Sequence, residues 1–196
     1  MKKRRKTPQK TVPVTVKLDL ACGQTKAEGW VGVDRVPTAC VDVVHDLLRF
    51  PWPFKDESVA EARCSHFVEH IPMAETPQGV DLLIAFMNEL HRVLVPGGKA
   101  TIIAPWYASV RAWQDPTHRR AISDATFLYF NRAWREREKL DHYPVTTDFD
   151  FVPSYTMDAA VAARNEETRA FWMTRYLNVI SDLTVVLTKR KPEGAP

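Results

Sequence analysis

The feature that most constrains the fold is a series of short strand-like segments that alternates with segments of helical periodicity. The predicted strands of the first half lie over residues 16–20, 30–33, 41–45, 59–65 and 99–104, where β-branched residues are frequent. Before the fifth strand, apolar residues recur every three or four positions, as in an amphipathic helix: Val80, Leu83, Ile84, Met87, Leu90 and Leu94. Strands that alternate with helices predict an α/β structure with a mainly parallel sheet.

The second half of the chain is predicted to add more elements of both kinds. The predicted helices lie over residues 123–140 and 158–177, and the predicted strands over 149–155 and 183–188. Pro153 weakens the first of these strands because proline has no N–H for the ladder. Pro96-Gly97-Gly98 is predicted to end the preceding helix, since proline cannot continue it and glycine accepts a turn.

Length and composition favour one globular domain. The chain has 196 residues, of which 45% are hydrophobic and 26% charged, so we expect a single domain over 14–191. No apolar run approaches the roughly 20 residues that span a bilayer, and no membrane partner is expected. The three cysteines form no Cys-x-x-Cys pair, which argues against a disulfide framework and favours a reducing cytoplasm.

The positive charge of the chain is concentrated at its N-terminus. The formal net charge is +3, but the run of five basic residues from Lys2 to Lys6 contributes +5 and leaves −2 for the remainder. We therefore expect residues 1–13 to be a flexible basic arm on a nearly neutral body, which is not the charge of a dedicated nucleic-acid binder. The arm is typical of a solvated tail, with contact to nucleic acid or an acidic partner as the alternative.

The clearest chemical pattern follows the first two predicted strands. Ala21, Cys22 and Gly23 come directly after the first strand, and their small size permits close approach of a ligand to the backbone. Asp34 ends the second strand, where a carboxylate can accept hydrogen bonds from both hydroxyls of a ribose, and Asp46 follows the third, within reach of an adenine amine. The alternative is an ordinary turn with exposed carboxylates.

This pattern differs from a dinucleotide-binding fingerprint. The loop holds only Gly23 where the fingerprint has Gly-x-Gly-x-x-Gly. Asp19 lies close to the loop and disfavours a pyrophosphate, whereas it favours a ligand that carries an ammonium or sulfonium group.

The chain resembles the class I S-adenosylmethionine-dependent methyltransferases, in particular their small members. The segments that carry the resemblance span about residues 16–106: Leu18 to Gly23, Gly29 to Asp34, Asp46-Leu47, Pro53 to Ser58, Ser65 to Ile71 and Leu90 to Gly98. The resemblance implies a Rossmann-like, doubly wound, mainly parallel seven-stranded sheet with helices on both faces. One departure is clear: only six residues separate Gly23 from Trp30, so the first helix must be shortened or lost.

The resemblance also implies roles for individual residues in binding S-adenosylmethionine. Asp19 and Gly23 would lie beside the methionine part, with Ala21 and Cys22 in the same cofactor-binding loop, and Asp34 would hold the ribose. Asp46 and Leu47 would contact the adenine, while Ser65 and His66 would border the methyl group, with ordinary capping of a strand end as the alternative.

A second candidate site is the run Asp115-Pro116-Thr117-His118-Arg119-Arg120, within an expected substrate-side insertion over 107–145. His118 has a side chain suited to accept a proton from an attacking hydroxyl or amine, and Asp115 would orient it. Arg119 or Arg120 would hold an anionic group of the substrate. The alternative is a turn capped by Asp115 with solvated arginines.

A third pattern, His66-Phe67-Val68-Glu69-His70, is similar to the His-x-x-Glu-His pattern of some zinc proteases. That pattern needs a helix, whereas here a strand precedes it and Pro72 follows at once. No third ligand is evident in the sequence, so we expect no metal, and Glu69 and His70 are expected to fix the turn.

These observations predict a methyltransferase that acts on an oxygen or nitrogen of a small-molecule, sugar or lipid-linked acceptor. Cys64-Ser65-His66-Phe67 stands where enzymes that methylate base amino groups carry Asn/Asp-Pro-Pro-Tyr, and no Pro-Cys nucleophile is present. Two alternatives remain open. One is a non-catalytic cofactor-binding module or partner subunit, and the other is a methyltransferase that binds nucleic acid through the basic arm.

Overall fold

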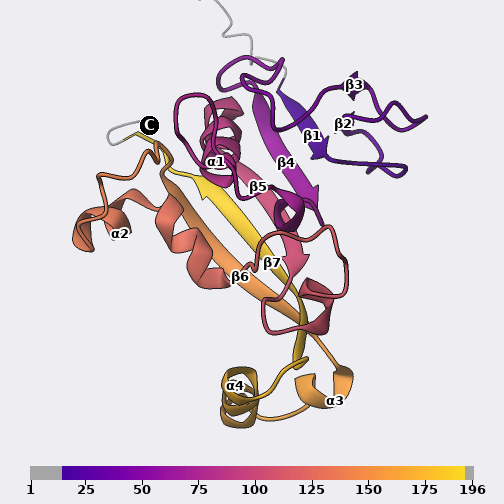
Figure 1. Cartoon of the computed structure of the whole chain (residues 1–196), viewed down its shortest axis with the longest axis vertical. Coiled ribbons are helices and arrows are strands. Elements are labelled where there is room, and N and C mark those ends of the chain that lie inside the picture. The colour runs from indigo at the N-terminus through magenta and orange to yellow at the C-terminus, as the bar shows by residue number, and fades with distance from the viewer. Residues whose placement is uncertain (1–14, 193–196) are drawn as a thin grey trace, which may run out of the picture.

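The computed structural model describes residues 15–192, which are built around a seven-stranded sheet (Figure 1). The strands are β1 (Val16–Leu20), β2 (Val31–Asp34), β3 (Val43–Val44), β4 (Val59–Ser65), β5 (Leu94–Pro105), β6 (Phe149–Met157) and β7 (Ile180–Lys189). Their order across the sheet is β3-β2-β1-β4-β5-β7-β6. Strand β7 runs antiparallel to both of its neighbours, β5 and β6, whereas the other neighbouring pairs are parallel. The predicted α/β fold with a mainly parallel seven-stranded sheet is confirmed. The predicted basic arm over 1–13 lies outside the described residues.

Asparagine side chains divide both helices predicted for the second half. The α-helices are α1 (Leu82–Val93), α2 (Arg132–Arg137), α3 (Ala159–Ala162) and α4 (Glu166–Arg175), and the 3-10 helices are η1 (Val68–His70), η2 (Val110–Ala112) and η3 (Asp124–Phe130). Asn131 is extended between η3 and α2, and its side chain accepts a hydrogen bond from the Trp134 N–H. Asn165 begins α4 in the same way. An asparagine that satisfies a free N–H group begins a new helix, so the continuous helices predicted over 123–140 and 158–177 are wrong.

The helix before β5 ends earlier than its sequence suggests. Asp81 caps α1 by accepting from the N–H groups of the next turn, and β5 begins at Leu94, directly after α1. The Pro-Gly-Gly segment 96–98 therefore lies inside β5. The register between β4 and β5 shifts there, which identifies a bulge. A Cβ at Gly98 would lie 2.8 Å from the Val95 carbonyl, so the bulge needs a glycine at this position.

The two faces of the sheet are covered unequally. One face is buried and shares a core with α1, η1 and η3, and its residues include Leu18, Leu20, Ala62, Cys64, Ile102 and Val185. The alternate residues of β4 and β7, such as Arg63 and Thr184, are only half-buried, and Val152 on β6 is 68% exposed. Residues 24–29 form turns with no helix, as the short connection predicted. The expected layer of helices is therefore well developed on one face only.

Within residues 15–192, no helix combines the length and the apolar character that crossing a bilayer requires.

Candidate functional site

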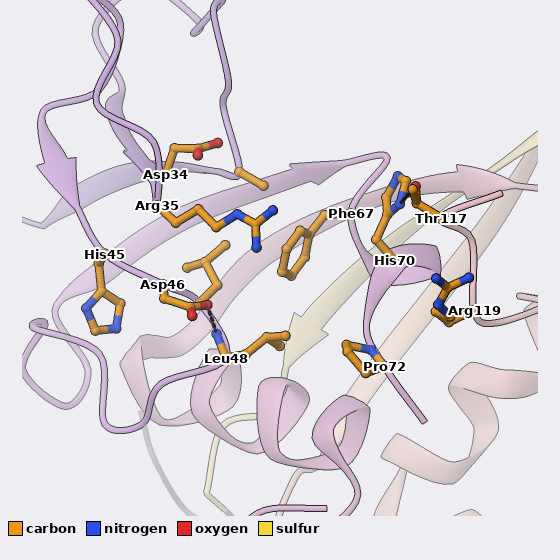
Figure 2. Close-up of a pocket in the computed structure, with 12 residues that line it drawn as sticks. Asp34, Arg35, His45, Asp46, Leu48, Phe67, His70, Pro72, Thr117 and Arg119 are labelled. Carbon is orange, nitrogen blue, oxygen red and sulfur yellow. Dashed lines mark hydrogen bonds between the residues drawn. The ribbon is translucent and has the colours of Figure 1, made fainter. Parts of the chain in front are cut away.

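A cavity of about 540 Å³ opens at the carboxyl ends of the first four strands. Its lining residues are Ala21, Asp34, Arg35, His45, Asp46, Leu47, Leu48, Phe67, His70, Pro72, Thr117 and Arg119. Figure 2 shows Asp34, Arg35 and Asp46 on one side, His70 and Thr117 on the other, and Phe67 between them. Ligands of open α/β sheets bind at this edge, and the volume lies in the usual range for small-molecule pockets, about 300–1,000 Å³.

The structure places four of the predicted cofactor residues on this lining and five outside it. Ala21, Asp34, Asp46 and Leu47 line the cavity, whereas Asp19, Cys22, Gly23, Ser65 and His66 do not. Asp19 is buried, accepts a hydrogen bond from the Ala27 N–H at 2.9 Å and lies 3.4 Å from Arg63 Nε. The Asp19 carboxylate therefore orders the β1–β2 loop, and it does not face the cavity in which a ligand would bind.

Asp34 joins the loop after β1 to the end of β2. One carboxylate oxygen accepts from the Gly23 N–H at 3.0 Å and the other from the Val36 N–H at 2.9 Å. Ala21 and Gly23 both have positive φ, at 54° and 58°, so this turn depends on residues with little or no side chain. A carboxylate has about four acceptor positions, and two remain for hydroxyl donors of a ligand.

The β2–β3 loop packs against the short turn after β1. Thr38 donates to the Gly23 carbonyl at 2.6 Å, and Asp42 accepts from the Gly32 N–H at 2.7 Å. A Cβ at Gly32 would lie 2.2 Å from the Cys40 carbonyl, so only glycine allows the β2–β3 loop to approach β2 this closely. This loop therefore supports the turn at one end of the cavity.

The Cys22 thiol lies in the same packed region. Burial, with Asp19 next in effect, raises the pKa of Cys22, which keeps the thiol protonated and unsuited to act as a nucleophile.

The wall after β3 presents one carboxylate beside apolar side chains. Asp46 accepts from the Leu48 N–H at 3.0 Å through one oxygen, and Leu47 is 3% exposed. Trp52 Nε1 donates to the Leu47 carbonyl at 3.0 Å and fixes the backbone of this segment. The wall therefore combines apolar side chains with a hydrogen-bond acceptor, which suits a heterocycle that carries an amine.

The opposite wall joins η1 to the loop that contains the Asp-Pro-Thr-His run. Thr117 Oγ1 lies 2.9 Å from His70 Nδ1 and donates to Asp115 Oδ1 at 2.7 Å. The N–H groups of Arg119 and Arg120 both donate to the Glu69 carbonyl, at 2.7 and 3.1 Å. Sequence reasoning missed His70 and Thr117 as lining residues, because their contact joins segments 47 positions apart and no local periodicity indicates it.

His118 and Asp115 do not form the predicted pair. The His118 side chain is 10% exposed and lies off the cavity lining, and its Nδ1 donates to the Ala112 carbonyl at 3.0 Å. Asp115 Oδ2 is 3.9 Å from His118 Nε2, which is too long for a hydrogen bond. The backbone carbonyl orients His118, while hydrogen bonds from Thr117 hold the pKa of Asp115 below its usual value.

The two arginines of this run have different surroundings. Arg120 donates to the Ile71 carbonyl at 2.9 Å, to the Pro72 carbonyl at 2.6 Å and to Asp81 at 2.8 Å, so it ties the loop to the start of α1. Arg119 is exposed and lines the cavity. Of the two, only Arg119 is placed to meet an anionic group there.

His66 lies at the end of β4 but outside the cavity lining. Its Nδ1 is 3.2 Å from Glu69 Oε1, and this hydrogen bond raises the pKa of His66 against the opposing effect of burial. Ser65 pairs with Ile103 in the β4–β5 ladder. Both residues hold the strand end beside η1.

Comparisons with known proteins point to one fold. No protein-family model matches the sequence, and no curated protein matches it. An S-adenosylmethionine-dependent methyltransferase from Archaeoglobus fulgidus superposes with a TM-score of 0.61 at 18% identity, over 89% of this chain and 86% of that one. A Listeria monocytogenes protein, provisionally described as such a methyltransferase, gives 0.53 at 10% identity, over 91% and 92%. The chain therefore has the Rossmann-like fold of the class I S-adenosylmethionine-dependent methyltransferases.

Proposed function

We propose that this protein binds S-adenosylmethionine in the 540 Å³ cavity and transfers its methyl group to an oxygen or nitrogen of a small-molecule, sugar or lipid-linked acceptor. The observation that carries the proposal is the position of two carboxylates. Asp34 and Asp46 end successive parallel segments and line one wall of the same cavity, in a chain with the methyltransferase fold.

The lining residues fit this cofactor better than a nucleotide phosphate. Asp34 retains acceptor positions for the two ribose hydroxyls. The second oxygen of Asp46 is not bonded to the Leu48 N–H and has only the exposed Arg49 Nε near it, at 3.8 Å, so it can accept from the adenine amine. Leu47 and Phe67 supply apolar surface for the ring. This wall carries two carboxylates and one cation, Arg35, so its net charge is negative. A negative wall repels a pyrophosphate and attracts a cation, and the sulfonium and ammonium groups of the cofactor are cations.

The other wall is proposed to receive the methyl acceptor. His70, Thr117 and Arg119 line it, and the last two belong to the 107–145 segment, which we propose is a substrate-side insertion. His70 presents its ring to the cavity, and the His118 ring packs edge-to-face on it with centroids 4.6 Å apart. His70 is therefore the residue that contacts the acceptor, while His118 and Asp115 position the His70 ring.

The reaction needs little covalent chemistry from the protein. When bound, the cofactor would supply a methyl group to the lone pair of the acceptor. The electrons of the broken carbon–sulfur bond stay on sulfur, and the acceptor releases its proton to solvent or to a nearby base. The chain's own residues hold the two reactants in line, an effect that can lower a barrier by roughly 7–11 kcal/mol.

One observation supports a second function, cofactor binding without turnover. The turn after β1 contributes only Ala21 to the cavity lining, because the connection to β2 is short and contains no helix. A cavity that is open on this side would hold the methionine part of the cofactor less firmly.

The test is titration calorimetry with S-adenosylmethionine and S-adenosylhomocysteine. We expect micromolar binding by the wild type and a loss of at least tenfold in Asp34→Asn. The matched control is Asp158→Asn, since Asp158 also accepts a backbone N–H from the residue two positions on, Ala160, but lies outside the cavity lining. The absence of binding at millimolar ligand, or equal losses in both variants, would contradict the proposed site.

Turnover is tested separately. Incubation with the cofactor and a library of hydroxyl- and amine-bearing acceptors, read by mass spectrometry as a gain of one methylene unit, distinguishes the two functions. Binding together with a methylated product supports the transferase, whereas binding without any product supports the non-catalytic module.

A further inference from the structure

Three metal-binding side chains converge beside the acceptor wall of the cavity. Glu69 and His70 come from η1, and His118 comes from the loop after η2. One potential ligand atom from each residue lies within 4.8 Å of the other two. We propose that Glu69, His70 and His118 bind one divalent transition-metal cation of the zinc or ferrous type.

The first argument is a carboxylate oxygen that lacks a partner. The Glu69 side chain is 1% exposed, and its Oε1 lies 3.2 Å from His66 Nδ1. Within the described residues 15–192, its Oε2 is buried and has no hydrogen-bond partner. A buried carboxylate oxygen without a partner is costly, and such orphaned groups in a native protein commonly mark an ion or water site. A cation held with His70 and His118 would supply the missing partner.

The second argument is the tautomer of His118. Its Nδ1 lies 3.0 Å from the Ala112 carbonyl oxygen. A carbonyl can only accept a hydrogen bond, so Nδ1 carries the proton and the lone pair of the neutral ring is on Nε2.

The same reasoning assigns the tautomer of His70. Thr117 donates its hydroxyl proton to Asp115 at 2.7 Å, and the ionised carboxylate only accepts. The Thr117 oxygen must therefore accept from His70 Nδ1 at 2.9 Å, which leaves the His70 lone pair on Nε2. Metal-binding histidines almost always donate their other ring N–H to a carbonyl, a carboxylate or a similar acceptor. Both rings have this arrangement before any cation is present.

The donor set selects the kind of cation. Two imidazoles and one carboxylate are the protein ligands of many zinc sites in which the fourth position is open. The same three ligands form the facial triad of ferrous iron, which also leaves positions open. Magnesium prefers oxygen ligands and binds this set poorly. Ligand atoms around a tetrahedral zinc lie about 3.4 Å apart, so separations up to 4.8 Å need small side-chain rotations to close.

The position of the site suggests what an open coordination position would do. Because His70 lines the cavity on the side proposed for the acceptor, a cation there would bind an acceptor oxygen and lower its pKa. This role rests on the proposed methyl transfer, whereas cation binding itself does not.

The experiment measures cation binding directly, without cofactor or acceptor. Purified full-length protein is stripped with a chelator, dialysed, and titrated with Co²⁺ and Zn²⁺, with visible absorption for Co²⁺ and calorimetry for both. We expect one equivalent to bind, at least tenfold more tightly than Mg²⁺. Glu69→Gln and His118→Gln should each weaken binding by about 100-fold or more, because loss of even an outer partner of a metal ligand commonly costs about 10- to 100-fold. The matched control is His142→Gln, which removes an exposed histidine that is not part of the cluster and should not change binding.

The outcomes separate this proposal from the proposed function. Absence of Co²⁺ and Zn²⁺ binding at 1 mM, or binding that survives both ligand variants, would overturn the metal site. Far-ultraviolet circular dichroism identifies a variant that fails to fold, and the other variant then decides. S-adenosylhomocysteine titration of the metal-free protein tests the cofactor site independently, so either proposal can fail alone.

Discussion

Thr117 Oγ1 lies 2.9 Å from His70 Nδ1 and joins two segments that are 47 positions apart in the sequence. The same hydroxyl donates to Asp115, so a chain of hydrogen bonds runs from a carboxylate through Thr117 to the ring of His70. This chain fixes the proton of His70 on Nδ1 and its lone pair on Nε2. The loop that contains the Asp-Pro-Thr-His run thereby orients a histidine outside that run.

Thr117→Val should release the His70 ring. Valine keeps the shape of threonine but cannot accept from Nδ1, so we expect the ¹⁵N shifts of the His70 ring to change from a single Nδ1–H tautomer to a mixture. S-adenosylhomocysteine affinity should stay within threefold, because Asp34 and Asp46 are untouched. Thr156→Val, on exposed β6, is the control and should leave the His70 spectrum unchanged. A wild-type tautomer in Thr117→Val would contradict the role of the hydroxyl.

Arg120→Gln and Arg119→Gln should affect stability very differently. Arg120 holds two backbone carbonyls and Asp81, so its loss should lower the free energy of unfolding by about 2–3 kcal/mol. Arg119 donates to the Pro116 and His118 carbonyls, but these contacts are exposed and lie within its own loop, so its replacement should change stability by less than about 0.5 kcal/mol. Urea denaturation of both variants measures the difference. Equal destabilisation would contradict the assignment of Arg120 as the residue that ties the loop to α1.

Gly32→Ala should displace the β2–β3 loop. The added methyl group would meet the Cys40 carbonyl at 2.2 Å and disturb the hydrogen bond from the Gly32 N–H to Asp42. We expect a loss of about 1–3 kcal/mol in unfolding free energy and weaker cofactor binding, because this loop supports the turn at Gly23. Gly29→Asn is the control, since its Cβ would meet no atom within 4 Å and asparagine tolerates positive φ. Thermal melts and calorimetry test both.

His91 should make stability fall in mild acid. Burial, followed by repulsion from Lys189 and Arg132 and opposed by Asp148, lowers the pKa of His91 to about 4 in the folded protein. An unfolded histidine has a pKa near 6.5, so between pH 6.5 and 4 the unfolded state binds more protons and stability decreases as pH falls. Partial exposure limits the effect to about 1–2 kcal/mol.

The measurement is urea denaturation at pH 7.0, 5.5 and 4.5 for the wild type and His91→Gln. Carboxylates titrate in both proteins, so the difference between them isolates His91. We expect the wild type to lose more stability than the variant over this range. A constant difference between the two proteins would show that the His91 ring does not titrate as expected.

The sequence by itself determined the strands and the kind of sheet. The segment 16–20 forms β1 with the predicted bounds, and 59–65 forms β4 likewise, because a period of two and β-branched side chains are local properties. It also determined that the first helix is missing, since six residues between Gly23 and Trp30 cannot form one and cross between parallel strands. Asp34 and Asp46, which both line the cavity, could be predicted from the sequence, because carboxylates that follow parallel strands lie at the same edge of the sheet.

Tertiary structure alone decided which residues meet. The pairing of His70 with Thr117, the hydrogen bond from His118 to Ala112 and the convergence of Glu69 with both histidines depend on how the 107–120 segment packs on η1. Asp19 points toward Arg63 rather than the cavity because alternate residues of β1 face opposite sides of the sheet. Contacts between distant segments carry no local periodicity, so the chain has to fold before they can be identified.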